Sequence, residues 1–335
     1  MLKYITKRLL RSLLTLFFII VIIFSLLRLM PIEGYFQNYD KMTPAQITSG
    51  LQTMGLTDPL PVQMLHFFQQ IFQGSLGISH IYRVNVPITD ILAEKAPISI
   101  KIGLLSLGLS LLVGLPLGVS MVLNASRKKR YRAAKKRNLL QKFGGFLSSL
   151  WNSLGVGFIV LIQAIPAAVY YLYIQLYGTS WFNIPLLFKE SKPITWVLPV
   201  VSLALGNIAY YAMWIRRFMT DELNRDYVQL ARAKGVSSRS IMFHHVFRNA
   251  FVPLIQYLPS SILYTVAGSI YVESLYSVPG MGGLLVNVIQ RQDNTIVQAL
   301  VLIYSAIGIV ALILGDLLMS LADPRITLTQ KEGSR

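Results

Sequence analysis

The sequence contains no cysteine, which excludes disulfide bonds and thiolate metal sites. Charge is also scarce, because 13% of the 335 residues are charged, against about 25% in a typical soluble domain. Among the charged residues the acidic ones are the rarer, with 14 Asp and Glu against 31 Lys and Arg. No Gly-Lys pair occurs anywhere, so the chain lacks the phosphate-binding loop G-x-x-x-x-G-K-S/T and cannot hold ATP in such a loop.

Apolar residues take the place of the missing charge: 54% of the chain is hydrophobic and its mean hydropathy is +0.55. The net charge of +17 is confined to short segments between long apolar runs, whereas nucleic-acid-binding proteins combine basic patches with a soluble core. We therefore predict an integral membrane protein that does not bind nucleic acid. Six stretches approach or exceed the roughly 20 residues that cross a bilayer as a helix. They run from about Leu9 to Leu29, Ile98 to Leu123, Leu150 to Leu176, Ile194 to Ile215, Ala250 to Val272 and Thr295 to Gly315.

These stretches predict an all-α polytopic membrane protein with six transmembrane helices, because they are longer than barrel strands and show no strict alternation. The first stretch has the basic start of a signal peptide, but its apolar part is too long and no cleavage pattern follows, so we interpret it as an anchor. Of the Lys and Arg residues, 23 lie in one alternate set of connecting segments and 6 in the other. The basic set predicts the cytoplasmic side and places both termini there.

The connection over residues 30–97 lies on the outer side in this topology. It is too long for a tight connector, so we predict a small external element, with a disordered outer loop as the alternative. The basic run over 127–142 is best explained as a topology determinant attracted to anionic membrane lipid.

The connection between the fourth and fifth stretches predicts a short helix and a sharp corner. Residues 227–234 form the helix, with Asp226 at its positive end and basic residues in its last turn. Gly235 stands where a left-handed residue is wanted, and Ser237 is a good N-cap for the helix that follows. Such a short helix can dock in a groove of a cytoplasmic partner and pass motion to the spans.

The sequence DYVQLARAKGVSSRSIMFHHVFRNAFVPLI (226–255) resembles the EAA loop of binding-protein-dependent ABC importer permeases, in the form used by the dipeptide and oligopeptide permeases. MLKYITKRLLRSLLTLFFIIVIIFSLLRLMP resembles the opening span of that family. GLTDPLPVQ (55–63) and GSLGIS (74–79) resemble its first external segment. VESLYSVPGMGGLLVNVIQRQDNTIVQA (272–299) and DLLMSLADPRI (316–326) are similar to its last connection and closing span. The chain departs from the family at Met30, Pro31, Ile32, Glu33 and Gly34, where Pro-Gly-Asp-Pro is usual.

The resemblance implies the type I ABC importer transmembrane fold and a permease subunit in a bacterial plasma membrane, importing dipeptides or oligopeptides. An extracellular solute-binding lipoprotein would deliver the substrate, a second homologous permease would complete the path, and two cytoplasmic P-loop ATPases would hold ATP and Mg. This chain would then be neither an enzyme nor the holder of a metal or cofactor. Nickel chelates, glutathione or oligosaccharides are the alternative cargoes within the family.

The resemblance also divides the chain into an anchor with its external segment (1–97), a transmembrane core (98–322) and a cytoplasmic tail (323–335). The EAA loop lies within the core at about 221–250. The residues that it assigns to ATPase coupling are Asp226, Tyr227, Ala231, Ala233, Lys234 and Gly235.

Polar residues within the spans are candidates for the translocation path, since amides facing lipid are disfavoured; hydrogen bonding between helices is the alternative. The candidates are Gln163, Asn207, Tyr210, Gln256, Ser260 and Tyr264. Glu273 and Asp316 fall at the ends of spans, which argues against a proton-driven secondary transporter. All four histidines lie outside the apolar cores, which argues against an intramembrane hydrolase. The neighbours His244 and His245 point about 100° apart on a helix and cannot share a metal.

Overall fold

The computed structural model describes residues 2–29, 32–36, 39–133, 139–267 and 269–322. Within these ranges every regular element is a helix, apart from one isolated bridge between Ile78 and Pro87. The tail over 323–335, Met30, Pro31 and part of the basic run (134–138) lie outside the described residues. The α-helices are α1 (Leu2–Arg28), α2 (Pro44–Thr53), α3 (Leu60–Phe72), α4 (Ile88–Ala133), α5 (Leu139–Ala164), α6 (Ala167–Phe182), α7 (Val197–Leu223), α8 (Asp226–Ala233), α9 (Ser238–Ser240), α10 (Arg248–Ala267), α11 (Ile270–Leu275), α12 (Met281–Gln290) and α13 (Asn294–Ala322). Shorter turns are η1 (Ile32–Tyr35), η2 (Tyr39–Lys41), η3 (Pro193–Trp196) and the π-helix η4 (Ile241–Phe247).

Five of the described helical segments are long and apolar enough to cross a membrane, which confirms a multi-pass helical protein. They are Leu9–Arg28, Ile88–Ala125, Phe143–Ala164, Pro193–Leu223 and Asn294–Met319. α10 is not among them; it has 20 residues and contains Pro253 and Pro259. The exact count of six spans therefore stays a prediction.

Two of the predicted spans have wrong boundaries. The stretch from Leu150 to Leu176 is not one helix, because α5 ends at Ala164 and α6 begins at Ala167. Pro166 lies between them and has no N–H for a helical hydrogen bond, and its ring disfavours the helical conformation of the preceding residue. The stretch from Ala250 to Val272 also breaks, because Ser269 is the N-cap of α11 and accepts a hydrogen bond from the Val272 amide.

The chain divides into two compact units. Unit 1 comprises residues 1–100, 266–313 and 328–335, and unit 2 comprises residues 101–265 and 314–327. The core of unit 1 includes Ile88 and Ile91 of α4, which pack with buried residues of α12 and α13. The core of unit 2 is made largely by α4, α7, η4 and α10, and Val228 of α8 is part of it.

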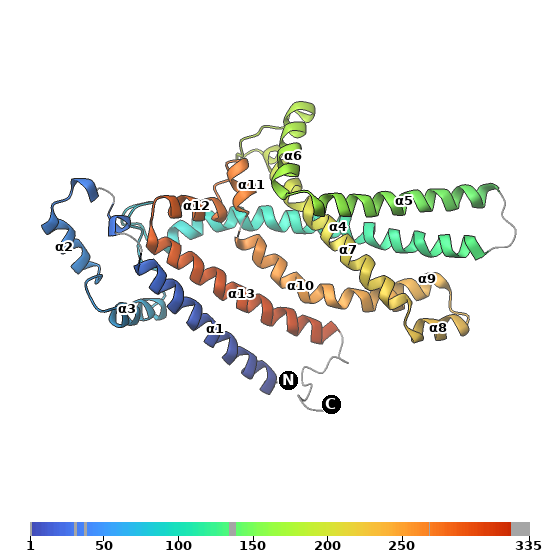
Figure 1. Ribbon diagram of the computed structural model, residues 1–335, viewed down its shortest axis with the longest axis horizontal. Helices are drawn as coiled ribbons and strands as arrows, with labels where there is room; N and C mark the ends of the chain where they lie inside the picture. Colours follow the sequence, from blue (N-terminus) through green and yellow to red (C-terminus); the bar gives the residue numbers. More distant parts are fainter. Residues whose placement is uncertain (1, 30–31, 37–38, 134–138, 268, 323–335) are drawn as a thin grey trace. The chain divides into compact units, whose positions relative to one another are not determined.

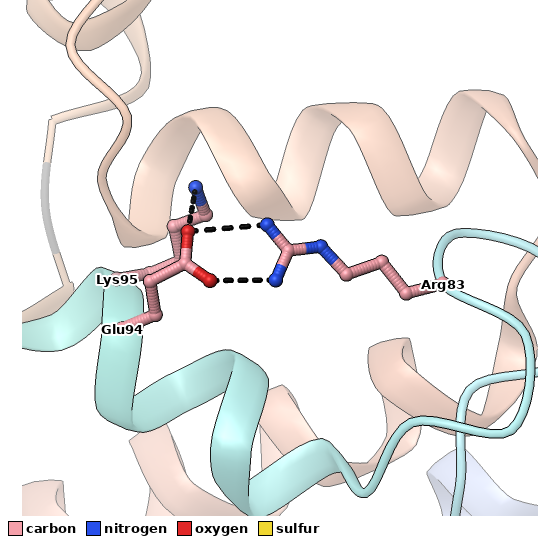
Figure 2. A network of polar contacts seen from close by, with 3 residues as sticks. All are labelled: Arg83, Glu94 and Lys95. Carbon is pink, nitrogen blue, oxygen red and sulfur yellow. Dashed lines mark hydrogen bonds and ion pairs between the residues drawn. The ribbon is translucent and has the colours of Figure 1, made fainter.

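The described residues of the connection over 30–97 are folded in unit 1. Thr43 and Gln46 form a reciprocal capping box at the start of α2, and the aromatic ring of Phe67 in α3 packs 5.6 Å from that of Phe24 in α1. Figure 2 shows how the segment meets α4: the guanidinium of Arg83 makes two hydrogen bonds to Glu94, and the Lys95 ammonium lies 3.0 Å from the same carboxylate. Arg83 and Glu94 are exposed and Lys95 is half-buried, so the exposed Arg83–Glu94 pair orients the loop and contributes at most about 1 kcal/mol.

Glycines let α4 and α7 approach closely in unit 2. A Cβ atom at Gly118 would lie 2.5 Å from the Ala212 carbonyl oxygen, and one at Gly114 would lie 2.8 Å from that of Ile208. Gly114 and Gly118, four residues apart, thus form a small-xxx-small motif for helix packing. α5 runs beside the second half of α4 (Figure 1), where the Trp151 indole N–H donates to the Ser120 hydroxyl at 3.0 Å.

Gly118→Val should destabilise the protein by about 1–3 kcal/mol, because the added atoms overlap the backbone of α7. Gly108→Val is the matched control, since nothing lies within 4 Å of a Cβ at that position of the same helix. The midpoint of thermal unfolding in detergent measures both. Equal midpoints for the two variants would contradict the close approach.

Candidate functional site

The candidate coupling element begins where α7 ends at Leu223. Asp226 opens α8, and one face of this eight-residue helix turns inward through Val228, which is fully buried in the core of unit 2. Ala231 packs against the same core. The opposite face is open: Leu230 is 56% exposed, and Ala233 and Lys234 are also exposed. α8 is therefore anchored on one side and presents an accessible surface on the other.

Tyr227 links three helices. Its hydroxyl donates a hydrogen bond to the Glu222 carboxylate at the end of α7, and it accepts one from the Asn249 side-chain amide at the start of α10, over 3.1 Å. Burial and the nearby Glu222 carboxylate raise the pKa of Tyr227 to about 12. The phenol therefore keeps its proton at physiological pH and remains a donor. This side chain therefore joins α8 to both α7 and α10.

Gly235 forms the corner after α8. Its φ of 75° lies in the left-handed region. The Gly235 amide donates to the Arg232 carbonyl over 3.0 Å, and the Val236 amide donates to the Ala231 carbonyl over 3.1 Å. These two bonds are the complete Schellman motif, which satisfies carbonyls that would otherwise be left free at the helix end. The helix and the left-handed corner are as the sequence predicted.

The chain leaves the corner through a cap and a widened helix. The Ser237 hydroxyl accepts a hydrogen bond from the Ser240 amide over 3.3 Å, which confirms the predicted N-cap. The helix that follows is not a plain α-helix, because residues 241–247 adopt the wider π form before α10 begins. No pattern in the sequence predicted this π-helical segment. π-Helical turns are rare and are frequent at functional sites.

A cavity of about 680 Å³ lies beside this element in unit 2. Arg225, Arg248, His244 and His245 line it together with one carboxylate, that of Glu222. The two histidines are thus part of a basic cavity wall. Among the residues that the structure describes, no group of three or more His, Cys, Asp or Glu is arranged to hold a metal ion.

The predicted path residues are dispersed over α5, α7 and α10 of unit 2. Tyr210 packs its ring 5.1 Å from that of Tyr257, and Ser260 is half-buried. Gln163 and Asn207 are exposed. The side chain of Tyr264 lies outside the described part of the structure. Their role in a path stays a prediction.

Gln256 makes a hydrogen bond between helices, the alternative to a place in the path. Its side-chain amide donates to the Asp316 carboxylate of α13 over 3.1 Å, and Asp316 is 8% exposed. Asp316 lies in the last turn of the apolar segment Asn294–Met319, near the end of this candidate span as predicted. An ionisable residue in such a segment needs a partner. The presence of an aspartate in an apolar run therefore indicates a polar partner on another helix, although it does not identify that partner.

Two buried carboxylates organise unit 1. Glu273 of α11 accepts hydrogen bonds from the Ser99 hydroxyl and the Gly283 amide, each over 2.8 Å. Gly280 leaves room for it, since a Cβ there would lie 2.6 Å from the Glu273 carboxylate. Asp293 accepts from the Ser79 hydroxyl and from two backbone amides, those of Ile81 and Tyr82. Both carboxylates join segments that are far apart in the sequence.

Comparison with known proteins agrees with this architecture. Residues 143–328 match the family described as binding-protein-dependent transport system inner membrane component, and residues 1–100 match the N-terminal part of such membrane components. The dipeptide transport system permease protein DppB of Lactococcus lactis subsp. cremoris is 30% identical over 331 residues, covering 98% of this chain and 100% of the relative. DppB of Bacillus subtilis is 31% identical over 332 residues, covering 99% and 100%. The oligopeptide transport system permease protein OppB of Haemophilus influenzae is 28% identical over 327 residues, covering 97% and 99%.

The family matches cover residues 1–100 and 143–328, from the first helix to the last, and the relatives align over 99% or more of their length. A multi-pass helical chain, a short helix with a glycine corner and these matches lead to one conclusion. The chain belongs to the family of inner membrane components of binding-protein-dependent transport systems.

Proposed function

We propose that this chain is a permease subunit of an ATP-driven importer that translocates dipeptides or oligopeptides handed over by an external solute-binding protein. The observation that carries the proposal is the anchored helix α8 with its glycine corner, because it offers an exposed docking surface and is tied to two longer helices. The relatives named as dipeptide and oligopeptide permeases support the peptide cargo. No covalent chemistry is done by this chain.

The energy comes from other subunits in this proposal. The sequence contains no phosphate-binding loop, so two cytoplasmic P-loop ATPases bind ATP and Mg and dock on the coupling elements. A second, homologous permease supplies the other half of the path. Leu230 and Val236 are exposed apolar side chains on α8 and its corner, and they are the contacts that we assign to the ATPase groove.

The polar side chains of the spans suit a peptide cargo. A peptide carries a repeating polar backbone and variable side chains. Amides and hydroxyls such as those of Asn207, Gln256 and Ser260 can exchange weak hydrogen bonds with that backbone without selecting a sequence. Specificity is then left to the external binding protein.

The proposed topology has six spans, with both termini in the cytoplasm and residues 30–97 outside. Cysteines introduced at Gln52 and Ser191 should react with an impermeant thiol reagent on intact cells, because both positions are exposed and on the outer side. A cysteine at Ala133 should react only after permeabilisation. The cysteine-free background gives no other signal. Labelling of Ala133→Cys on intact cells would overturn this orientation.

Gly235→Val should abolish coupling without preventing membrane insertion. The space at Gly235 is open, since nothing lies within 4 Å of a Cβ there. The cost is conformational, because holding a β-branched residue at positive φ raises the free energy of the folded state by roughly 1–3 kcal/mol. Gly235→Asn is the matched control, because asparagine tolerates the left-handed region. Peptide uptake and substrate-stimulated ATPase activity should collapse in the valine variant and largely persist in the asparagine variant.

Equal activity of the two Gly235 variants, or near-normal uptake by the valine variant, would remove the coupling role. Membrane-inserted amounts must be matched by immunoblot before the activities are compared.

Deleting the gene from an amino-acid auxotroph should abolish growth on peptides that supply the missing residue and leave growth on the free amino acid unchanged. Other peptide importers must be absent from the strain. A mutant that grows on peptides but loses nickel or oligosaccharide uptake would assign the chain to another cargo of the same family.

A further inference from the structure

A polar cavity of about 540 Å³ lies in unit 1, where the end of α1 meets α2, α3 and the start of α13. Arg28 and Tyr35 line it together with the amides of Gln63, Asn294 and Gln298. No aspartate or glutamate is among its lining residues. Its volume is that of a small-molecule site, and its wall carries a positive charge and several amides but no negative charge.

Several buried polar atoms in this wall have no partner among the described residues. Asn294 is 3% exposed and neither its side-chain oxygen nor its nitrogen is hydrogen-bonded. Gln63 is 9% exposed and its side-chain oxygen is also free. The Nε atoms of Arg28 and Gln298 complete the set. Buried polar groups are normally paired. A ligand that offers both hydrogen-bond donors and acceptors would pair these atoms.

Arg28 is the fixed charge of the cavity. Its guanidinium is held by a 2.8 Å hydrogen bond to the Tyr35 hydroxyl and lies 4.8 Å from the centre of the Phe24 ring. His80 does not add a charge at neutral pH, because burial lowers its pKa although Asp293 acts in the opposite direction. The Asp293 carboxylate is itself held by three donors from residues 79–82. An anionic group is therefore favoured beside Arg28.

The polar cavity adjoins an apolar crease. Phe67 and Gln298 line both. The crease is otherwise lined by Ile20 and Ile23 of α1, with Val301 and Leu302 of α13 among its other apolar residues. It has about 10 Å³ of open volume, so a hydrocarbon chain would lie along it and not inside it. Most of α1 is exposed or half-buried, and 6% of its apolar window is buried. A polar site joined to an apolar crease is amphipathic.

We propose that this cavity binds the headgroup of an anionic phospholipid, with the phosphate at Arg28 and Tyr35 and one acyl chain along the crease. Headgroup hydroxyls then meet the free oxygens of Gln63 and Asn294, and the free Nε of Gln298 donates to a headgroup or ester oxygen. A glycerol headgroup, as in phosphatidylglycerol, offers both donors and acceptors. The proposal rests on the topology proposed above, which places this end of α1 at the outer leaflet.

The test uses the complete importer in nanodiscs that contain phosphatidylglycerol and phosphatidylcholine in equal amounts. Native mass spectrometry measures which lipid the complex retains. The unmodified complex should retain phosphatidylglycerol preferentially. Arg28→Gln should lower that preference about tenfold, the effect of losing one charge-assisted contact. Arg291→Gln is the matched control. Like Arg28→Gln, it removes an arginine that lies over an aromatic ring, here that of Tyr82, but Arg291 does not line the cavity.

Gln298→Leu is a second variant for the case in which Arg28→Gln does not assemble. It removes the amide shared by the cavity and the crease but keeps an apolar side chain, and it should lower the preference about threefold. Equal losses in the Arg28 and Arg291 variants would mean general attraction of lipid to surface charge and would overturn the proposal. So would unchanged retention in both cavity variants.

Two further arms identify the source of the anion. Displacement of the retained lipid by millimolar inorganic phosphate would assign the site to free phosphate, and displacement by a tripeptide would assign it to the cargo. Either result overturns the lipid assignment. Peptide uptake is measured with the same variants in sealed proteoliposomes, so loss of lipid selectivity with intact uptake separates this proposal from the transport function.

Discussion

The hydrocarbon of a membrane offers no hydrogen-bond partner to a peptide group, so a chain that crosses it must pair its backbone internally. The long helices α1, α4, α7 and α13 meet this requirement over most of their length. Backbone N–H and C=O groups without a helical partner remain where helices begin, end or break. The Schellman corner at Gly235, the cap at Ser237 and the break at Pro166 lie at such places.

Loops between the helices of unit 1 meet the same requirement through buried carboxylates. Asp293 accepts hydrogen bonds from three donors of the distant segment 79–82, and Glu273 accepts from the distant Ser99 and from Gly283. Each buried carboxylate is stabilised by backbone amides and hydroxyls, since an unpaired charge there would be costly. Asp293 thereby fixes residues 79–82, and the loop that contains them forms part of the wall of the polar cavity at Arg28. The lipid site that we propose depends on this anchoring.

In unit 2 the same kind of pairing holds α8 in place. Val228 is buried, Tyr227 bridges Glu222 and Asn249, and the end of α8 is closed by the two hydrogen bonds of the Schellman motif. α8 is therefore joined to α7 and α10 on one side and exposed on the other. The π-helix at 241–247 follows the cap at Ser237, where a wider helical turn joins the corner to α10.

The sequence by itself determined the class of protein, the long apolar helices and the corner at Gly235, because these follow from composition, from unbroken hydrophobic runs and from local residue chemistry. It also carried the family resemblance. Only the tertiary structure decided which groups separated by long stretches of chain pair with each other. Asp293 with Ser79, Glu273 with Ser99 and Gln256 with Asp316 could not be read from any pattern, because their partners are set by how the helices pack. The cavity at Arg28 depends on four segments meeting in space, and no local signal marks it.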